Sequence, residues 1–186
     1  LLRGARQVGK SSSVRHLAKQ FDYFVEINFE RKPAYLEIFK GDRDAKHIVE
    51  MIKSITGEPI VPGKTLLFFD EIQMCQEAIS SLRFFWEDMP GLHVIAAGSL
   101  LEFALSEIPT FGVGRIHSMF MYPMSFDEFL NALSMFSLQK YKREASPEKP
   151  LLSALHEQLV SLFRTYLMAG GMPESVSTWV DTHSYV

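Results

Sequence analysis

Short apolar runs alternate with stretches of helical periodicity along the first two thirds of the chain. We expect a strand to end at residues 1–4, and further strands at 23–29, 65–71, 93–99 and 115–122. The run TLLFFDE at 65–71 is continuously apolar up to its two acids. That pattern is typical of a strand buried on both faces of a parallel sheet.

Between these runs, the apolar positions follow the 3.6-residue period of amphipathic helices. We expect one helix to begin near residue 11, two helices within 33–56 that break near Gly41, and another at 76–89. Alternation of strands and helices predicts an α/β fold with a parallel, doubly wound sheet. We assign residues 1–122 to this α/β core.

The pattern changes after residue 122. Ser125 stands three residues before Glu128 at the start of a helical stretch, which is the spacing of a capping box. The polar stretch 139–150 predicts a solvated loop, and the apolar stripe within 151–171 predicts a long helix that ends at its two glycines. We interpret residues 123–186 as a small helical subdomain.

Residues 4–11, GARQVGKS, match the P-loop pattern G-x-x-x-x-G-K-[ST]. Its glycines permit backbone angles at which successive N–H groups point inward at phosphate oxygens. Lys10 is expected to reach the β- and γ-phosphates, and Ser11 to bind Mg²⁺. The alternative is a glycine-rich turn before a solvated basic helix. The predicted nucleotide-binding residues are Gly4, Ala5, Arg6, Gln7, Val8, Gly9, Lys10, Ser11 and Ser12.

Two acids end the apolar run at 65–71. Asp70 fits the acid that holds Mg²⁺ in P-loop ATPases, and Glu71 is then placed to polarise a water against the γ-phosphate. Taken alone, the pair is more typical of a strand that runs into a solvated turn. The P-loop upstream reverses that preference, and we predict Lys10 and Glu71 as catalytic residues.

Three more candidates lie near predicted strand ends. Ser99 is expected to contact the γ-phosphate or the attacking water, or else to cap the helix that follows it. Arg115 follows a glycine-rich loop and is expected to stabilise charge on the transferred phosphoryl group, in cis or in a neighbouring subunit, or else to be a surface arginine. Asn28 either hydrogen-bonds Glu71 or is a turn residue.

Composition narrows the class of protein. The 186 residues are 47% apolar and 22% charged, which is typical of a globular chain. The net charge of -3 gives no reason to expect nucleic acid or an anionic membrane as partner. Cys75 is the only cysteine, so no disulfide forms within the chain, as is typical of the cytoplasm. No apolar run approaches the length of a membrane-spanning helix.

The chain begins with Leu, inside the strand that should precede the P-loop. We therefore expect it to be part of a longer chain. An N-terminal segment and C-terminal domains of that chain would then be its partners.

The sequence resembles the AAA+-like ATPases of a prokaryotic family that joins an AAA domain to a C-terminal domain called DUF4143. The stretches that carry the resemblance are GARQVGKSS, LLFFDEIQ, VIAAGSLLEF, VGRIHSMFMYPMSFDEFL and MAGGMPESV. The resemblance implies a P-loop NTPase fold whose five-stranded parallel sheet has the order 5-1-4-3-2, followed by a helical lid. It also implies ATP and Mg²⁺ as cofactors, with Lys10 and Ser11 as phosphate and metal residues, Asp70 and Glu71 as Walker B acids, and Ser99 at the sensor-1 position.

The leading hypothesis is a cytoplasmic, Mg²⁺-dependent ATPase of AAA+ type. It would be slow without a partner, and hydrolysis would drive or gate a conformational change. One alternative is a nucleotide-gated switch with negligible turnover, and another is a motor associated with nucleic acid. A P-loop kinase is a further alternative, against which Glu71 argues. The expected partners are ATP and ADP, another protein or a second copy of this chain.

Overall fold

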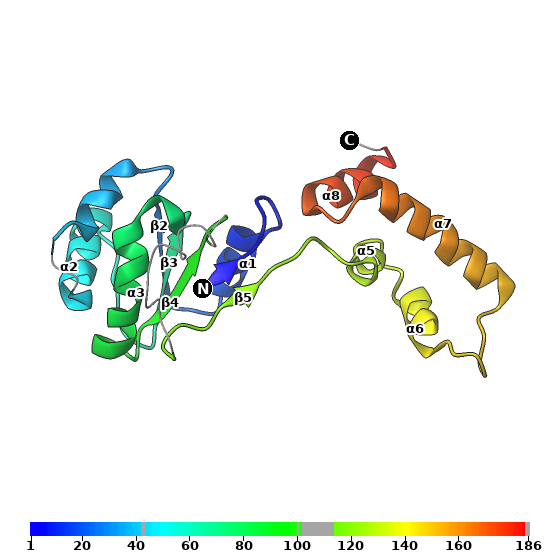
Figure 1. The fold of residues 1–186 in the computed structure, drawn as a ribbon, viewed down its shortest axis with the longest axis horizontal. Helices are drawn as coiled ribbons and strands as arrows, with labels where there is room; N and C mark the ends of the chain where they lie inside the picture. Colours follow the sequence, from blue (N-terminus) through cyan, green and yellow to red (C-terminus); the bar gives the residue numbers. More distant parts are fainter. Residues whose placement is uncertain (42–43, 100, 102–113, 185–186) are drawn as a thin grey trace. The chain divides into compact units, whose positions relative to one another are not determined.

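The computed structural model describes residues 1–41, 44–99, 101 and 114–184 (Figure 1). The chain divides into two compact units, Leu1–Met121 and Tyr122–Val186. The helix expected directly after Ser99 and the glycine-rich loop before Arg115 fall mainly on residues 100 and 102–113, outside the described part of the chain.

The first unit is built on a sheet of five parallel strands. They are β1 (Leu2–Arg3), β2 (Tyr23–Asn28), β3 (Thr65–Asp70), β4 (His93–Ala97) and β5 (Met119–Phe120). Their order across the sheet is β2-β3-β4-β1-β5, with parallel pairing throughout. This is the order that the family resemblance implies, and the predicted α/β fold class is confirmed.

Helices cover both faces of this sheet (Figure 1). They are α1 (Lys10–Ala18), α2 (Ala45–Thr56) and α3 (Gln76–Asp88), with 3₁₀ helices η1 (Pro33–Phe39) and η2 (Ile72–Met74). All six residues of β3 are buried. Leu66 and Phe68 belong to the core cluster of α1, whereas Leu67 and Phe69 belong to that of α2 and α3. This alternation is the two-residue period of a strand covered on both faces.

The carboxyl ends of three strands lie level with one another. Asn28 of β2 pairs with Asp70 of β3, and Asp70 pairs with Ala97 of β4. Polar residues that follow these strands therefore emerge at one edge of the sheet, where open α/β sheets bind their ligands.

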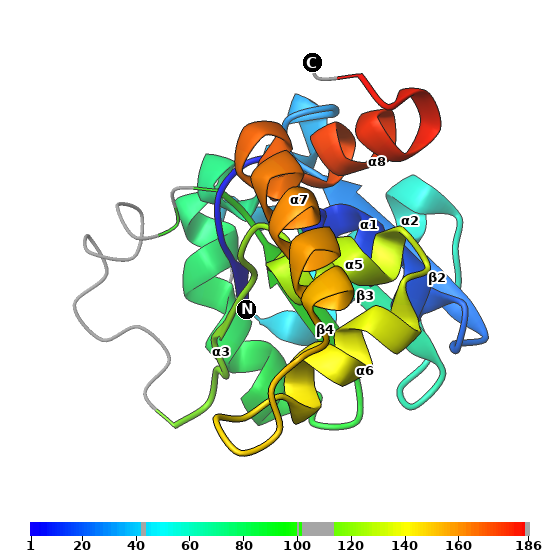
Figure 2. The same cartoon turned by 90° about the vertical axis from the view of Figure 1, so that its right-hand side faces the viewer.

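The second unit consists of α5 (Phe126–Ala132), α6 (Phe136–Glu144), α7 (Ser153–Ala169) and α8 (Pro173–Thr182). Helix α5 packs against the other three (Figure 2). The predicted capping box is confirmed, because Ser125 Oγ accepts from the Glu128 N–H and the Glu128 carboxylate accepts from the Ser125 N–H.

The prediction of a loop at 139–150 is wrong for residues 139–144, which continue α6. Burial and pairing with α5 stabilise this polar stretch as a helix. Gln139 is buried and donates to the Asp127 carbonyl oxygen at 2.9 Å, and Lys142 pairs with the Asp127 carboxylate at 2.8 Å. Hydrophobic periodicity alone does not detect a helix that is anchored by polar contacts.

Two of the stretches that carry the family resemblance meet in this unit. The Met124 N–H donates to the Gly171 carbonyl oxygen at 2.7 Å, and a Cβ at position 171 would lie 2.3 Å from the Met124 carbonyl oxygen. Among the described residues, no helix combines the length and the apolar character that crossing a membrane requires.

Candidate functional site

The loop from Gly4 to Gly9 turns the chain from β1 into α1. Three of its residues have positive φ: Gly4 at 141°, Gln7 at 64° and Gly9 at 95°. Gly9 stands at the N-cap of α1, no side chain caps that end, and its first turn contains no acid. The N–H groups and the positive dipole end of α1 are therefore available to an anion in the loop.

A close approach between backbones fixes the start of this loop. A Cβ on Gly4 would lie 2.1 Å from the Met121 carbonyl oxygen, just after β5. Glycine is required at this position both for its φ and for space. Farther along the loop Ala5, Arg6 and Gln7 are exposed and Val8 is buried, and Ser12 is exposed in the first turn of α1.

Lys10 lies inside the loop, and only 6% of its surface is exposed. Its ammonium donates to the carbonyl oxygens of Gly4 at 2.9 Å and Ala5 at 2.6 Å. Burial lowers the pKa of the Lys10 ammonium, while the carboxylates of Glu71 and Asp70 act in the opposite direction. The cation is thus held where it faces both acids of the β3 end.

Asp70 is 4% exposed, and its carboxylate receives hydrogen bonds from side chains of α1 and β2. Ser11 Oγ donates to its two oxygens at 2.9 and 3.0 Å, and Asn28 Nδ2 donates to Oδ2 at 3.0 Å. The hypothesis that Asn28 bonds Glu71 is therefore wrong: Asn28 bonds the neighbouring acid. Arg15 lies farther off, 3.9 Å from the same carboxylate.

These groups fit a magnesium ion. Mg²⁺ binds through one or two protein ligands together with phosphate oxygens and water, at about 2.1 Å in octahedral geometry, so adjacent ligands lie about 3 Å apart. Ser11 Oγ and the Asp70 oxygens have this separation. Among the described residues, no cluster of three or more His, Cys, Asp or Glu side chains is placed to hold a metal ion.

Glu71 has an unusual backbone conformation for a residue other than glycine. Its φ of 53° and ψ of 42° are left-handed and turn the chain from β3 into η2. Its carboxylate accepts a hydrogen bond from Gln73 Nε2 at 2.6 Å. Sequence reasoning missed Gln73, because its contact with Glu71 follows a left-handed turn that the sequence pattern does not predict.

Ser99 joins the same edge of the sheet. It is 2% exposed, and its Oγ lies 3.4 Å from Arg6 Nε, which donates to it. The Arg6 guanidinium also lies 3.8 Å from Glu30. The P-loop, the end of β2 and the end of β4 are thus linked through one arginine, which sequence reasoning counted only as a loop residue.

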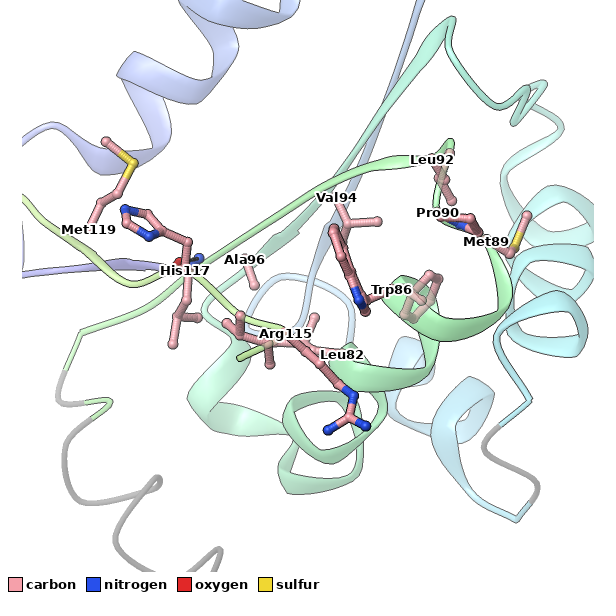
Figure 3. Close-up of a pocket in the computed structure, with 13 residues that line it drawn as sticks. Leu82, Trp86, Met89, Pro90, Leu92, Val94, Ala96, Arg115, His117 and Met119 are labelled. Carbon is pink, nitrogen blue, oxygen red and sulfur yellow. Dashed lines mark hydrogen bonds between the residues drawn. The ribbon is translucent and has the colours of Figure 1, made fainter. Parts of the chain in front are cut away.

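Arg115 is not brought to this edge. Its Nε is paired with Glu87 Oε1 of α3 at 2.7 Å. It lines a cavity of about 290 Å³ together with Leu1, Trp86 and Val94 (Figure 3). That cavity lies toward the start of β1 and β4, at the amino ends of the strands, so a role for Arg115 in phosphoryl transfer stays a prediction.

Cys75 is 2% exposed, and burial raises the pKa of its thiol to about 11. The thiol is therefore protonated near neutral pH and is a packing group of the core.

The site and the fold define a class of protein. A P-loop, a helix that begins at its last glycine and an acid pair at the end of a buried parallel strand are the parts of a P-loop nucleotide-binding ATPase. A family model described as "AAA domain" matches residues 1–130, and the chain belongs to this family.

Solved structures agree on the fold. The Walker-type ATPase PABY2304 of Pyrococcus abyssi superposes with a TM-score of 0.55 at 17% identity, covering 98% of this chain. PCH-2 of C. elegans gives 0.52 at 15% identity, covering 95%. This chain spans 63% of the length of the first and 52% of the second. No curated protein matches the sequence.

Proposed function

We propose that this chain binds Mg-ATP at the P-loop edge of its sheet and hydrolyses it. The observation that carries the proposal is that three side chains converge at one place. Lys10 is hydrogen-bonded to the P-loop backbone, and Ser11 is hydrogen-bonded to Asp70. Glu71 follows directly, and its N–H donates to Asp70. Family membership supports the proposal, and so does the fold that the chain shares with the Walker-type ATPase PABY2304.

Each residue has a distinct role in this proposal. Lys10 exchanges its two carbonyl partners for the β- and γ-phosphates, so that ATP meets a cation already placed in the loop. Ser11 and Asp70 hold Mg²⁺, which supplies charge neutralisation to the phosphates. Glu71 orients the attacking water as a general base.

The remaining residues position these groups. Asn28 orients the Asp70 carboxylate, and Arg6 links the loop to Ser99, which we place beside the γ-phosphate. We assign residues 1–122 as the catalytic core and 123–186 as a helical lid. Hydrolysis in this proposal drives or gates a conformational change in the cytoplasm.

The test measures two quantities, phosphate release from Mg-ATP and nucleotide affinity, for the wild type, Lys10→Ala and Glu71→Gln. Lys10→Ala should weaken ATP binding about 10- to 100-fold, because a hydrogen-bonded charge pair is lost. Glu71→Gln should bind ATP normally and lower kcat by on the order of 100-fold, because only the base is lost.

Two matched variants control for nonspecific effects. Lys19→Ala removes an exposed lysine at the C-cap of the same helix, and Glu58→Gln neutralises an exposed acid in the turn before β3. Both should keep wild-type affinity and kcat. If the wild type and Glu71→Gln released phosphate at equal rates, the role of Glu71 as the general base would be ruled out.

A further inference from the structure

The carboxamide of Gln73 lies against the acid that we assign to hydrolysis. Its Nε2 donates to Glu71 Oε2 at 2.6 Å, a short hydrogen bond to an ionised group. In the part of the chain that the structure describes, no other side chain hydrogen-bonds the Glu71 carboxylate. Asp70, by contrast, is held by Ser11 and Asn28.

Rigid backbone holds Gln73 in this place. The left-handed turn at Glu71 leads directly into η2, where the Met74 N–H donates to the Glu71 carbonyl oxygen at 3.0 Å. Ile72 is completely buried and anchors the turn in the core. A left-handed residue other than glycine costs free energy and persists where the surrounding structure enforces it, often at functional sites.

The far side of the carboxamide packs on the backbone that follows β4. A Cβ on Gly98 would lie 2.1 Å from Gln73 Oε1, so the glycine leaves the space that this oxygen occupies. Gln73 Oε1 is itself buried and has no hydrogen-bond partner. The carboxamide is thus wedged between the Glu71 carboxylate and the chain just before Ser99.

This arrangement fixes which way the amide points. With the NH₂ group toward Glu71, the amide donates to the carboxylate; the opposite orientation would set two acceptors against each other. With the NH₂ group toward Glu71, the buried Gln73 Oε1 has no hydrogen-bond partner, which is unfavourable for stability. A glutamine that stays in this place despite the unpaired oxygen is more readily explained by its bond to Glu71 than by its contribution to stability.

We propose that Gln73 is the positioning residue of the hydrolytic reaction. It holds Glu71 Oε2 and so directs the other carboxylate oxygen, Oε1, to the attacking water. This inference rests on the proposed ATPase function and adds a residue to it. It predicts that loss of the amide donor affects turnover and spares nucleotide binding, because Lys10 and the loop are untouched.

The first test replaces Gln73 with Met, which keeps the length of the side chain and removes the donor. In steady-state hydrolysis of Mg-ATP, kcat should fall about 10- to 100-fold, since a misplaced catalytic group costs rate in this range. KM and ATP affinity should stay within about twofold. Gln20→Met, the same change at an exposed glutamine after α1, should leave all three quantities unchanged.

Gln73→Glu keeps the shape of the side chain and sets a carboxylate against Glu71. Its kcat should fall at least as far as that of Gln73→Met. Gly98→Ala leaves both side chains intact and displaces the carboxamide through the added methyl group. It should show the same loss of kcat with unchanged affinity, which tests the proposal without any change at Gln73.

A double-mutant cycle separates positioning from a purely structural effect. In a Glu71→Gln background, Gln73→Met should cause no further loss of kcat, because its target is already removed. Wild-type turnover in Gln73→Met, a rise in its kcat, or an additive loss in the cycle would each overturn the positioning role while leaving the ATPase proposal standing. A wild type that binds ATP and never releases phosphate would overturn both.

Discussion

At the scale of single residues, the buried cation in the P-loop makes a testable link between protons and nucleotide. Burial holds the pKa of Lys10 below its ordinary value of 10.5. Bound phosphate favours the charged ammonium, so the pKa should rise when ATP binds. Protons should therefore be taken up on binding at pH values between the lowered pKa of the unbound protein and the higher pKa of the complex, up to about one proton per nucleotide.

Calorimetry in pairs of buffers with different ionisation enthalpies measures this uptake. This uptake should grow as the pH rises toward the lowered pKa of Lys10 in the unbound protein, and ATP affinity should decline with it, because the unbound ammonium loses its proton first. Lys19→Met, at an exposed lysine, should give the wild-type result. An uptake independent of pH would show that Lys10 is fully protonated before ATP arrives.

At the scale of elements, the contact between the P-loop and the end of β5 predicts the effect of a single methyl group. Gly4→Ala would force a residue into φ of 141° and set its Cβ 2.1 Å from a backbone oxygen. We expect the free energy of unfolding to fall by about 3 kcal/mol or more, from strain and overlap together. ATP affinity should fall too, because the loop moves.

Gly57→Ala supplies the matched comparison for Gly4→Ala. Gly57, the C-cap of α2, also has a positive φ, of 72°, but open space surrounds its Cβ position. Gly57→Ala should lower the free energy of unfolding by only about 1 kcal/mol, and ATP binding should be unchanged. Urea unfolding and ATP titration measure both variants. Equal losses would mean that φ alone, rather than the approach of β5, requires the glycine at position 4.

The sequence predicted those elements whose signal is local. The apolar run predicted β3 and the glycine spacing predicted the P-loop, because each signal lies within a few consecutive residues. Burial on both faces needs apolar residues, and positive φ favours glycine. The family resemblance supplied the strand order, because a pattern within one chain contains no information about which strands are neighbours.

Features that depend on distant partners were not predicted. By helical periodicity Trp86 shares one face of α3 with Ile79 and Leu82, which are buried, yet Trp86 is 58% exposed. The pairing of Arg115 with Glu87, and of Asn28 with Asp70 instead of Glu71, depends on distances that spacing does not give. The role of Gln73 depends on the left-handed turn at Glu71, and no propensity rule predicts that conformation for a glutamate.

At the scale of the whole molecule, the division into Leu1–Met121 and Tyr122–Val186 separates the candidate site from the helical unit. Each unit has its own core, and all the residues assigned to Mg-ATP lie in the first. The chain contains two tryptophans, Trp86 in the first unit and Trp179 in the second. Trp179→Phe and Trp86→Phe therefore give single-tryptophan reporters, one for each unit.

These reporters test whether nucleotide stabilises one unit or both. A ligand that binds only the native state stabilises it by about 2.7 kcal/mol at a concentration 100 times Kd. We expect Mg-ATP to move the urea transition seen by Trp86 by that amount, because the residues assigned to Mg-ATP lie in the unit of Trp86. If residues 123–186 act as the proposed lid, the transition seen by Trp179 should shift as well, and a Trp179 transition that stays in place would contradict the lid role.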